Sequence, residues 1–109
     1  MLAINMLSII FYSSLLIGTL PSHAIQTQRN FQCANSLSFI LSSEGDIRDA
    51  FRVSGVFLKL KLKGKNYSMI SAQGADNTRF YGTDNDYSVI SWGSVSLLKG
   101  NKYIGEKCR

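Results

Sequence analysis

Apolar and polar residues alternate along most of the chain after residue 30, and this period of two limits the chain to β-strands. Residues 56–63 are the clearest case, with leucine or valine at every even position. We expect strands at residues 30–34, 37–42, 56–63, 67–70, 78–81, 87–91, 94–98 and 102–108. The segment 47–53 is ambiguous, because 50–53 fits a strand whereas 44–50 fits a short helical turn. Short strands spaced by turns predict one all-β domain, an antiparallel barrel or sandwich.

The first twenty residues of the chain carry no charged side chain, and a small-residue cleavage site follows them. Ser22 and Ala24 occupy its −3 and −1 positions. The sequence therefore predicts a signal peptide over residues 1–24, cut after Ala24, and a periplasmic domain over residues 25–109 without membrane attachment. An uncleaved anchor is the alternative, because about twenty mostly apolar residues can just span a bilayer.

The two cysteines, Cys33 and Cys108, lie near the two ends of the predicted domain. An oxidising compartment favours a disulfide between them, and neither belongs to a Cys-x-x-Cys pair that would indicate redox chemistry. Closing so long a loop removes unfolded-state entropy worth about 4 kcal/mol, a large share of a small domain's stability. We therefore expect one disulfide that joins the first and last strands.

Catalysis has few candidate residues, because the single histidine, His23, lies in the predicted leader. The domain then has no Ser–His or Cys–His pair and no ordinary zinc ligand set. We expect no enzyme, no metal and no other cofactor. Two carboxylate pairs, Asp46 with Asp49 and Asp84 with Asp86, match glycosidase chemistry in residue type. Each lies in a predicted turn, where aspartate is favoured for local hydrogen bonds.

All charged side chains follow the leader, and their net charge is +5. The cations are too weakly clustered to indicate a nucleic-acid-binding protein. The sharpest cluster is Lys59, Lys61 and Lys63, with Lys65 beyond them, on one face of a predicted strand. Beside Phe57 this lysine row fits an anionic ligand. A solvated face and an edge strand that lysines protect from aggregation are the structural alternatives.

Two breaks in the strand pattern consist mainly of small residues, at 71–77 and at 91–93. Loops on a rigid β-scaffold often carry binding residues. The second break contains the only tryptophan, Trp92, which is either a core residue or an exposed contact.

Several short motifs occur in order along the predicted domain. They are Phe31-Gln32-Cys33, Leu58-Lys59-Leu60, Gly64, Tyr67, Ser71-Ala72-Gln73-Gly74-Ala75, Ser91-Trp92-Gly93 and the closing Cys108. In this order they resemble the bacterial inhibitors of c-type lysozyme, a family with membrane-bound and periplasmic members. The first loop is similar to that family's Ser-Ala-Ser-Gly-Ala segment, and the second to its Ser/Thr-Lys-Gly segment. Without a lipid-attachment cysteine, the chain resembles the periplasmic branch.

The resemblance implies an eight-stranded antiparallel barrel that blocks the active-site cleft of c-type lysozyme with two loops, around 71–77 and 91–94. The binding residues that it implies are Ser71, Ala72, Gln73, Gly74, Tyr81, Ser91, Trp92 and Gly93. In the family, a loop serine and a loop lysine address the enzyme's catalytic carboxylates, which a hydroxyl donor and a cation would satisfy. The partner is then a protein, and pairing with a second copy of the chain stays open.

Three positions depart from the family's pattern. Gln73 occupies the position of the serine before glycine, which leaves Ser71 as the matching donor. Trp92 occupies the position of the lysine. Asn77 occupies the position of a tyrosine, for which Tyr81 is the equivalent if the loop carries a short insertion. The alternative function is a small cell-envelope β-barrel that binds an anionic ligand through the lysine row.

Overall fold

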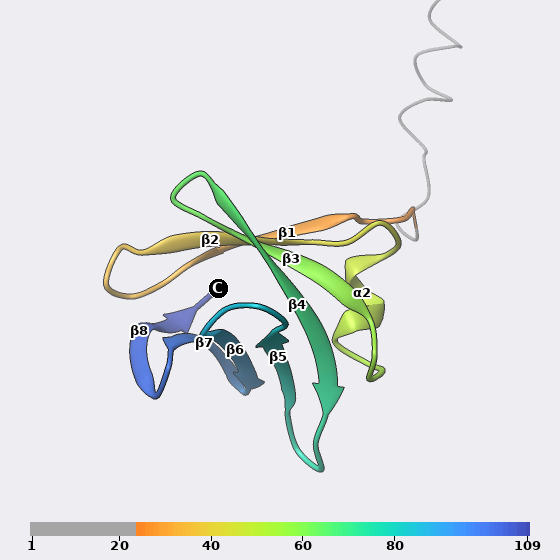
Figure 1. Ribbon diagram of the computed structural model, residues 1–109. Coiled ribbons are helices and arrows are strands. Elements are labelled where there is room, and N and C mark those ends of the chain that lie inside the picture. The colour runs from red at the N-terminus through yellow and green to blue at the C-terminus, as the bar shows by residue number, and fades with distance from the viewer. Residues whose placement is uncertain (1–23) are drawn as a thin grey trace, which may run out of the picture.

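The computed structural model describes residues 24–109, so the predicted leader lies outside the described part except for its last residue. The described chain forms one antiparallel sheet in which each strand pairs with its neighbours in sequence (Figure 1). The elements are β1 (Gln28–Gln32), β2 (Ser38–Ser42), α2 (Ile47–Ala50), β3 (Phe57–Leu62), β4 (Lys65–Gln73), β5 (Thr78–Gly82), β6 (Tyr87–Trp92), β7 (Ser94–Lys99) and β8 (Lys102–Cys108). The all-β, eight-stranded prediction is confirmed.

The sheet curls until β1 meets β8, which gives a nearly closed barrel. At this seam Gln32 and Arg109 exchange two backbone hydrogen bonds of 3.0 Å. The disulfide between Cys33 and Cys108, with an S–S distance of 2.02 Å, lies beside these bonds. The predicted disulfide is therefore confirmed, and it links the ends of the first and last strands.

The barrel interior is filled by side chains from all eight strands. On β3 the leucines are buried, whereas Phe57, Lys59 and Lys61 are exposed, as the alternating pattern predicts. The largest fully buried side chains are Phe31, Phe80, Leu41, Ile47, Leu60, Met69, Leu97 and Val89. Each strand thus contributes one face to the core and leaves the other face for solvent or a partner.

The short helix α2 lies beside one end of the barrel (Figure 1). Asp46 precedes it and accepts the backbone N–H of Arg48 at 3.0 Å, which is the geometry of a helix N-cap. Ile47 and Ala50 are buried, so the helix presents apolar side chains to the core. The strand interpretation of residues 50–53 is wrong, because capping and burial outweigh the local β-propensity of that segment.

Candidate binding edge of the barrel

The two segments with broken strand pattern lie next to each other at one end of the barrel. Gln73 pairs with Thr78 across β4 and β5, and Thr78 pairs with Ser91 across β5 and β6. This row places the β4–β5 loop beside the β6–β7 turn. We call the surface formed by residues 73–77 and 91–94 the loop edge.

The strand β4 extends further toward the loop edge than the sequence predicts. It continues to Gln73, so residues 71–73 are strand and the loop is limited to residues 74–77. A tertiary contact supports this extension, because the connector between α2 and β3 runs alongside β4. There the backbone N–H of Gly55 donates to the carbonyl of Ser71 at 2.8 Å.

Ser71, the serine that the motif resemblance predicts to contact the enzyme, is only 3% exposed. Its hydroxyl donates to the carbonyl of Val53 at 2.8 Å and accepts the backbone N–H of Val56 at 3.0 Å. Both contacts are internal to the domain. The side chain of Ser71 therefore anchors the connector from within and does not face the loop edge.

Gln73 is exposed and is held in place by two neighbours. Its Oε1 atom lies 2.9 Å from the hydroxyl of Thr78, which also lies 3.0 Å from the carbonyl of Phe51. Its backbone N–H donates to the hydroxyl of Ser54 at 2.7 Å. The side-chain amide is thus positioned by the fold while it remains reachable from solvent.

Trp92 is 68% exposed, so the interpretation as a core residue is wrong. It ends β6 and pairs with Ser94, with only Gly93 between them. The φ angle of Gly93 is +72°, a conformation that glycine adopts without the strain of a side chain. This tight turn presents the indole ring to solvent at the loop edge.

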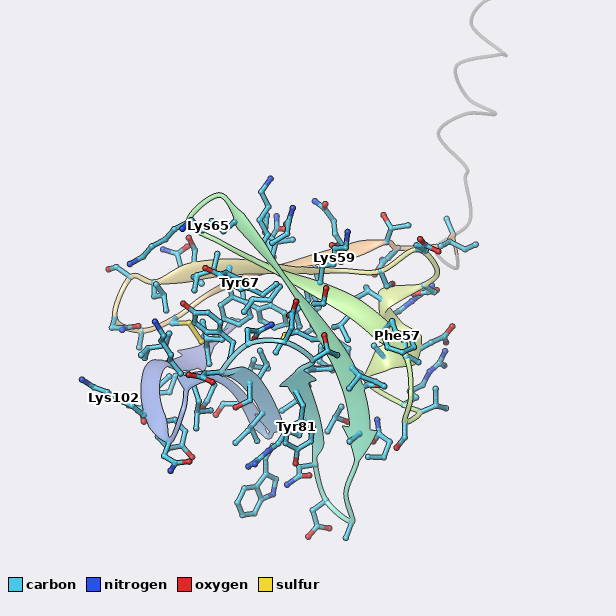
Figure 2. The ribbon with its side chains drawn as sticks, in the orientation of Figure 1. Phe57, Lys59, Lys65, Tyr67, Tyr81 and Lys102 are labelled. Atoms are coloured by element: carbon cyan, nitrogen blue, oxygen red, sulfur yellow. A yellow bond between two sulfur atoms is a disulfide. The ribbon has the colours of Figure 1, made fainter. Side chains whose placement is uncertain are left out.

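The outer face of β5 and β6 continues the loop edge with a cation and a second aromatic ring. Arg79 pairs with Ile90, which lies two residues before Trp92 on the same face of β6. The guanidinium carbon of Arg79 lies 5.5 Å from the ring centroid of Tyr81, which is 45% exposed. Tyr81 is labelled in Figure 2. Sequence reasoning missed Arg79, because only the strand register shows that it neighbours Trp92.

The other residues assigned to the site differ in accessibility. Gly74 and Gly93 are exposed, whereas Ala72 and Ser91 are half-buried. The backbone N–H of Gly74 donates to the carbonyl of Asn77 at 2.8 Å and closes the β4–β5 loop. The accessible part of the predicted site is therefore the glycine turns with Gln73 and Trp92, flanked by Tyr81.

The lysine row lies on a different part of the barrel. Strand β3 pairs with β2 on one side and β4 on the other, so the interpretation of its lysines as edge protection is wrong. In the view of Figure 2, Lys59 and Lys65 lie on the upper side of the barrel and Tyr81 lies near the bottom. The lysines are thus separate from Tyr81. Lys63 lies in the turn after β3 with a φ of 51°, so the prediction that it shares one strand face with Lys59 and Lys61 is wrong.

The predicted carboxylate pairs have local structural roles. Hydrogen bonds from the side chain and backbone of Arg48 lower the pKa of Asp46 to about 2. Asp49 forms an ion pair with Arg52, and the second carboxylate pair lies in the turn between β5 and β6. Among residues 24–109, no group of three His, Cys, Asp or Glu side chains is placed to hold a metal ion. No helix within that same range is long and apolar enough to cross a membrane.

No protein-family model matches the chain, and no curated protein or solved structure matches it. The assignment of a function therefore rests on the geometry of the loop edge and on the motif resemblance.

Proposed function

We propose that the domain is a periplasmic inhibitor of c-type lysozyme that inserts the loop edge into the enzyme's active-site cleft. The observation that carries this proposal is the position of Trp92, 68% exposed on a glycine turn beside the β4–β5 loop. An exposed tryptophan on a rigid β-scaffold is a typical anchor of a protein interface, because it buries a large area at little entropic cost.

Polar recognition in this proposal differs from the family's serine and lysine pair. The hydroxyl of Ser71 is occupied inside the domain. Gln73, the last residue of β4, is an accessible donor of the loop edge. Arg79 is the nearby cation, because it pairs with Ile90, which lies two residues before Trp92 on β6. A guanidinium group presents a fork of donors that matches a carboxylate, so Arg79 fits the role that a loop lysine has in the family.

The test is lysozyme turnover on bacterial cell walls with and without a stoichiometric amount of the purified domain, residues 25–109. We expect the domain to lower turnover, and more domain to lower it further until the enzyme is saturated. Reduced and alkylated domain, which lacks the disulfide, is the control for nonspecific effects of a cationic protein. Unchanged turnover at micromolar domain would exclude the inhibitor function.

The donors can be tested separately from the fold. Arg79→Gln removes the cation but keeps a hydrogen-bonding side chain of similar length, and we expect weaker inhibition. Arg29→Gln is the matched control, because Arg29 is an exposed arginine on β1 that also packs over aromatic rings. Equal inhibition by both variants would remove Arg79 from the proposed contact.

A further inference from the structure

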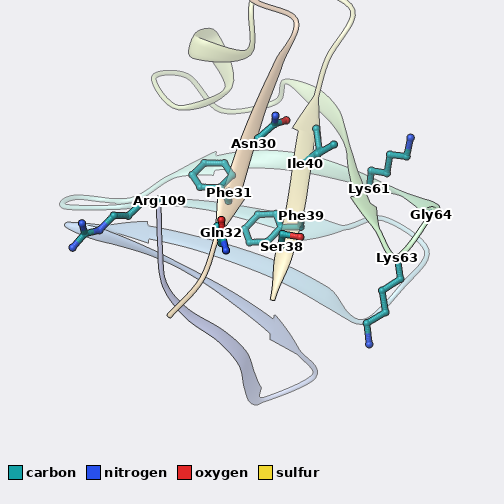
Figure 3. Close-up of a pocket in the computed structure, with 10 residues that line it drawn as sticks. All are labelled: Asn30, Phe31, Gln32, Ser38, Phe39, Ile40, Lys61, Lys63, Gly64 and Arg109. Atoms are coloured by element: carbon teal, nitrogen blue, oxygen red, sulfur yellow. The ribbon is translucent and has the colours of Figure 1, made fainter. Parts of the chain in front are cut away.

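The outer face of β1, β2 and β3 contains a hollow of about 470 Å³ (Figure 3). Lys61 and Lys63 lie on one side of it and Arg109 on the other. The polar side chains between them are Asn30, Gln32 and Ser38. No acidic residue is among those that line it. We call this surface the cationic hollow.

The cations of the hollow are not neutralised by neighbouring carboxylates. In the described part of the chain, the salt bridges are Arg48 with Asp46 and Arg52 with Asp49, all near α2. Opposite Lys61 the two neighbouring strands present Ile40 and Asn66. Three positive side chains around one concavity that no acidic side chain lines attract anions and concentrate them there.

The next lysine along β3, Lys59, lies in a different electrostatic environment. Lys59 lies two residues before Lys61 on the same exposed face, at a spacing of about 7 Å along the strand. Its neighbours across the sheet are Ser42 and Ser68, and it lines a second hollow together with Glu44, Asp46 and Asp49. Lys59 is therefore outside the proposed site, which is limited to the cationic hollow.

The side chains between the cations favour a sugar polymer over a nucleic acid. Asn30, Gln32 and Ser38 offer hydrogen-bonding groups for hydroxyls. The two aromatic residues that line the hollow, Phe31 and Phe39, are each only 2% exposed and stack on one another at 5.1 Å. They offer no free ring for the base stacking on which single-stranded nucleic-acid binding depends.

We propose that the cationic hollow binds an acidic polysaccharide through the carboxylates of its sugars. The lysines act as point charges for successive carboxylates, and Arg109 offers a forked contact to one carboxylate. Lys61 and Lys63 lie away from the loop edge, whereas Arg109 follows Cys108, which pairs with Val95 next to the β6–β7 turn. The two lysines are therefore the residues that separate this activity from lysozyme inhibition.

The experiment is a titration of the domain into a fluorescently labelled oligogalacturonate at low salt, where charge contacts are least screened. The methyl-esterified oligosaccharide, which has the same sugars without charge, is the ligand control. We expect binding of the acid form alone. Equal binding of the ester, or no binding of the acid form, would overturn the proposal.

Paired variants locate the binding surface. Lys61→Gln with Lys63→Gln removes two charges from the hollow, and we expect a roughly tenfold loss of affinity from two exposed charge contacts. Lys102→Gln with Lys107→Gln removes the same charge elsewhere, and it is well matched because Lys63 and Lys107 share a φ of 51°. An equal loss in both double variants would show a diffuse charge effect and refute the hollow as the site.

Arg109→Gln keeps the test decisive if the first double variant does not fold, because Arg109 is exposed at the end of the described chain. We expect it to weaken oligogalacturonate binding. Competition separates other anion sources: inorganic phosphate, single-stranded DNA and vesicles containing phosphatidylglycerol are added at equal total charge. Unlabelled oligogalacturonate is the reference competitor. If any of the other anions displaces the labelled oligogalacturonate at a lower total charge than this reference, the proposed ligand class is contradicted.

Discussion

Ser71 and Val56 are joined by two hydrogen bonds: the backbone N–H of Ser71 donates to the carbonyl of Val56 at 2.9 Å, and the hydroxyl of Ser71 accepts the N–H of Val56 at 3.0 Å. The same hydroxyl donates to the carbonyl of Val53. One buried side chain thereby ties the connector after α2 to β4. The loop edge at the end of β4 is supported from inside by this contact.

Ser71→Ala is expected to destabilise the domain by about 1–3 kcal/mol, because it leaves partly buried backbone groups of the connector without their partner. Urea unfolding measures the difference. Ser54→Ala, which removes an exposed hydrogen bond to Gln73, is the control and should cost less. Full stability with lost lysozyme inhibition would instead show that Ser71 contacts the enzyme.

Trp92→Ala is expected to weaken lysozyme binding at least roughly tenfold, because truncation of a central aromatic anchor often costs 2 kcal/mol or more. Stability should change by less than about 0.5 kcal/mol, since the side chain is exposed. Affinity is measured by calorimetry and folding by circular dichroism.

Phe57→Ala is the matched control for Trp92→Ala, because Phe57 is 71% exposed and lies on β3, outside the loop edge and separated from Tyr81 by Ile70 of β4. We expect it to leave inhibition unchanged. Inhibition that survives Trp92→Ala but falls with Phe57→Ala would move the contact to the face of β3.

Replacing both cysteines, Cys33→Ser with Cys108→Ser, is expected to lower the free energy of unfolding by about 4 kcal/mol, the value for a loop of this length. Denaturant unfolding of the double variant and the wild-type domain measures the loss. Thiol titration of denatured, unreduced wild-type protein should find no free thiol. A double variant as stable as the wild type would show that the seam's hydrogen bonds are sufficient to close the barrel.

The Asp46 carboxylate makes stability depend on pH in the acid range. Its pKa is lowered from 3.8 to about 2 in the fold, chiefly by the hydrogen bond from the Arg48 side chain. Because the folded pKa lies below the unfolded one, the contribution is fully present above the unfolded value and is lost as the pH falls toward 2. Asp46→Asn keeps a capping oxygen but removes the charge.

Thermal unfolding at a series of pH values compares Asp46→Asn with the wild type. We expect the wild type to be more stable at neutral pH and its advantage to shrink between pH 3.8 and about 2. An advantage that stays constant across this interval would show that the ion pair with Arg48 does not contribute.

Local alternation is sufficient to predict most strands of this fold. Strand β3 is recognisable because every second residue is apolar, which is the pattern of a barrel strand with one face in the core and the other in solvent. The choice between barrel and sandwich is different, since it depends on the seam where Gln32 meets Arg109, far apart in sequence. The short helix α2 was ambiguous for the same reason, because its burial is decided by the strands around it.

The loop edge was predictable in position but not in detail. Small residues and the tryptophan indicate both of its segments, and the register places them side by side. The inward orientation of Ser71 could not be predicted, because it depends on the connector packing against β4. The role of Arg79 could not be predicted for a related reason. Its position in the site depends on its pairing with Ile90 and its contact with Tyr81, which the sequence does not show.

The sequential order of the strands has a kinetic consequence. Each strand pairs with the next one along the chain, so most pairings are short-range and the hairpins can form one after another. The seam between β1 and β8 is the exception, because Cys33 and Cys108 are separated by 75 residues. In the folded barrel, docking of the last hairpin holds the two sulfurs together at the seam. Completed folding thus favours oxidation, and the disulfide in turn holds the assembled barrel closed.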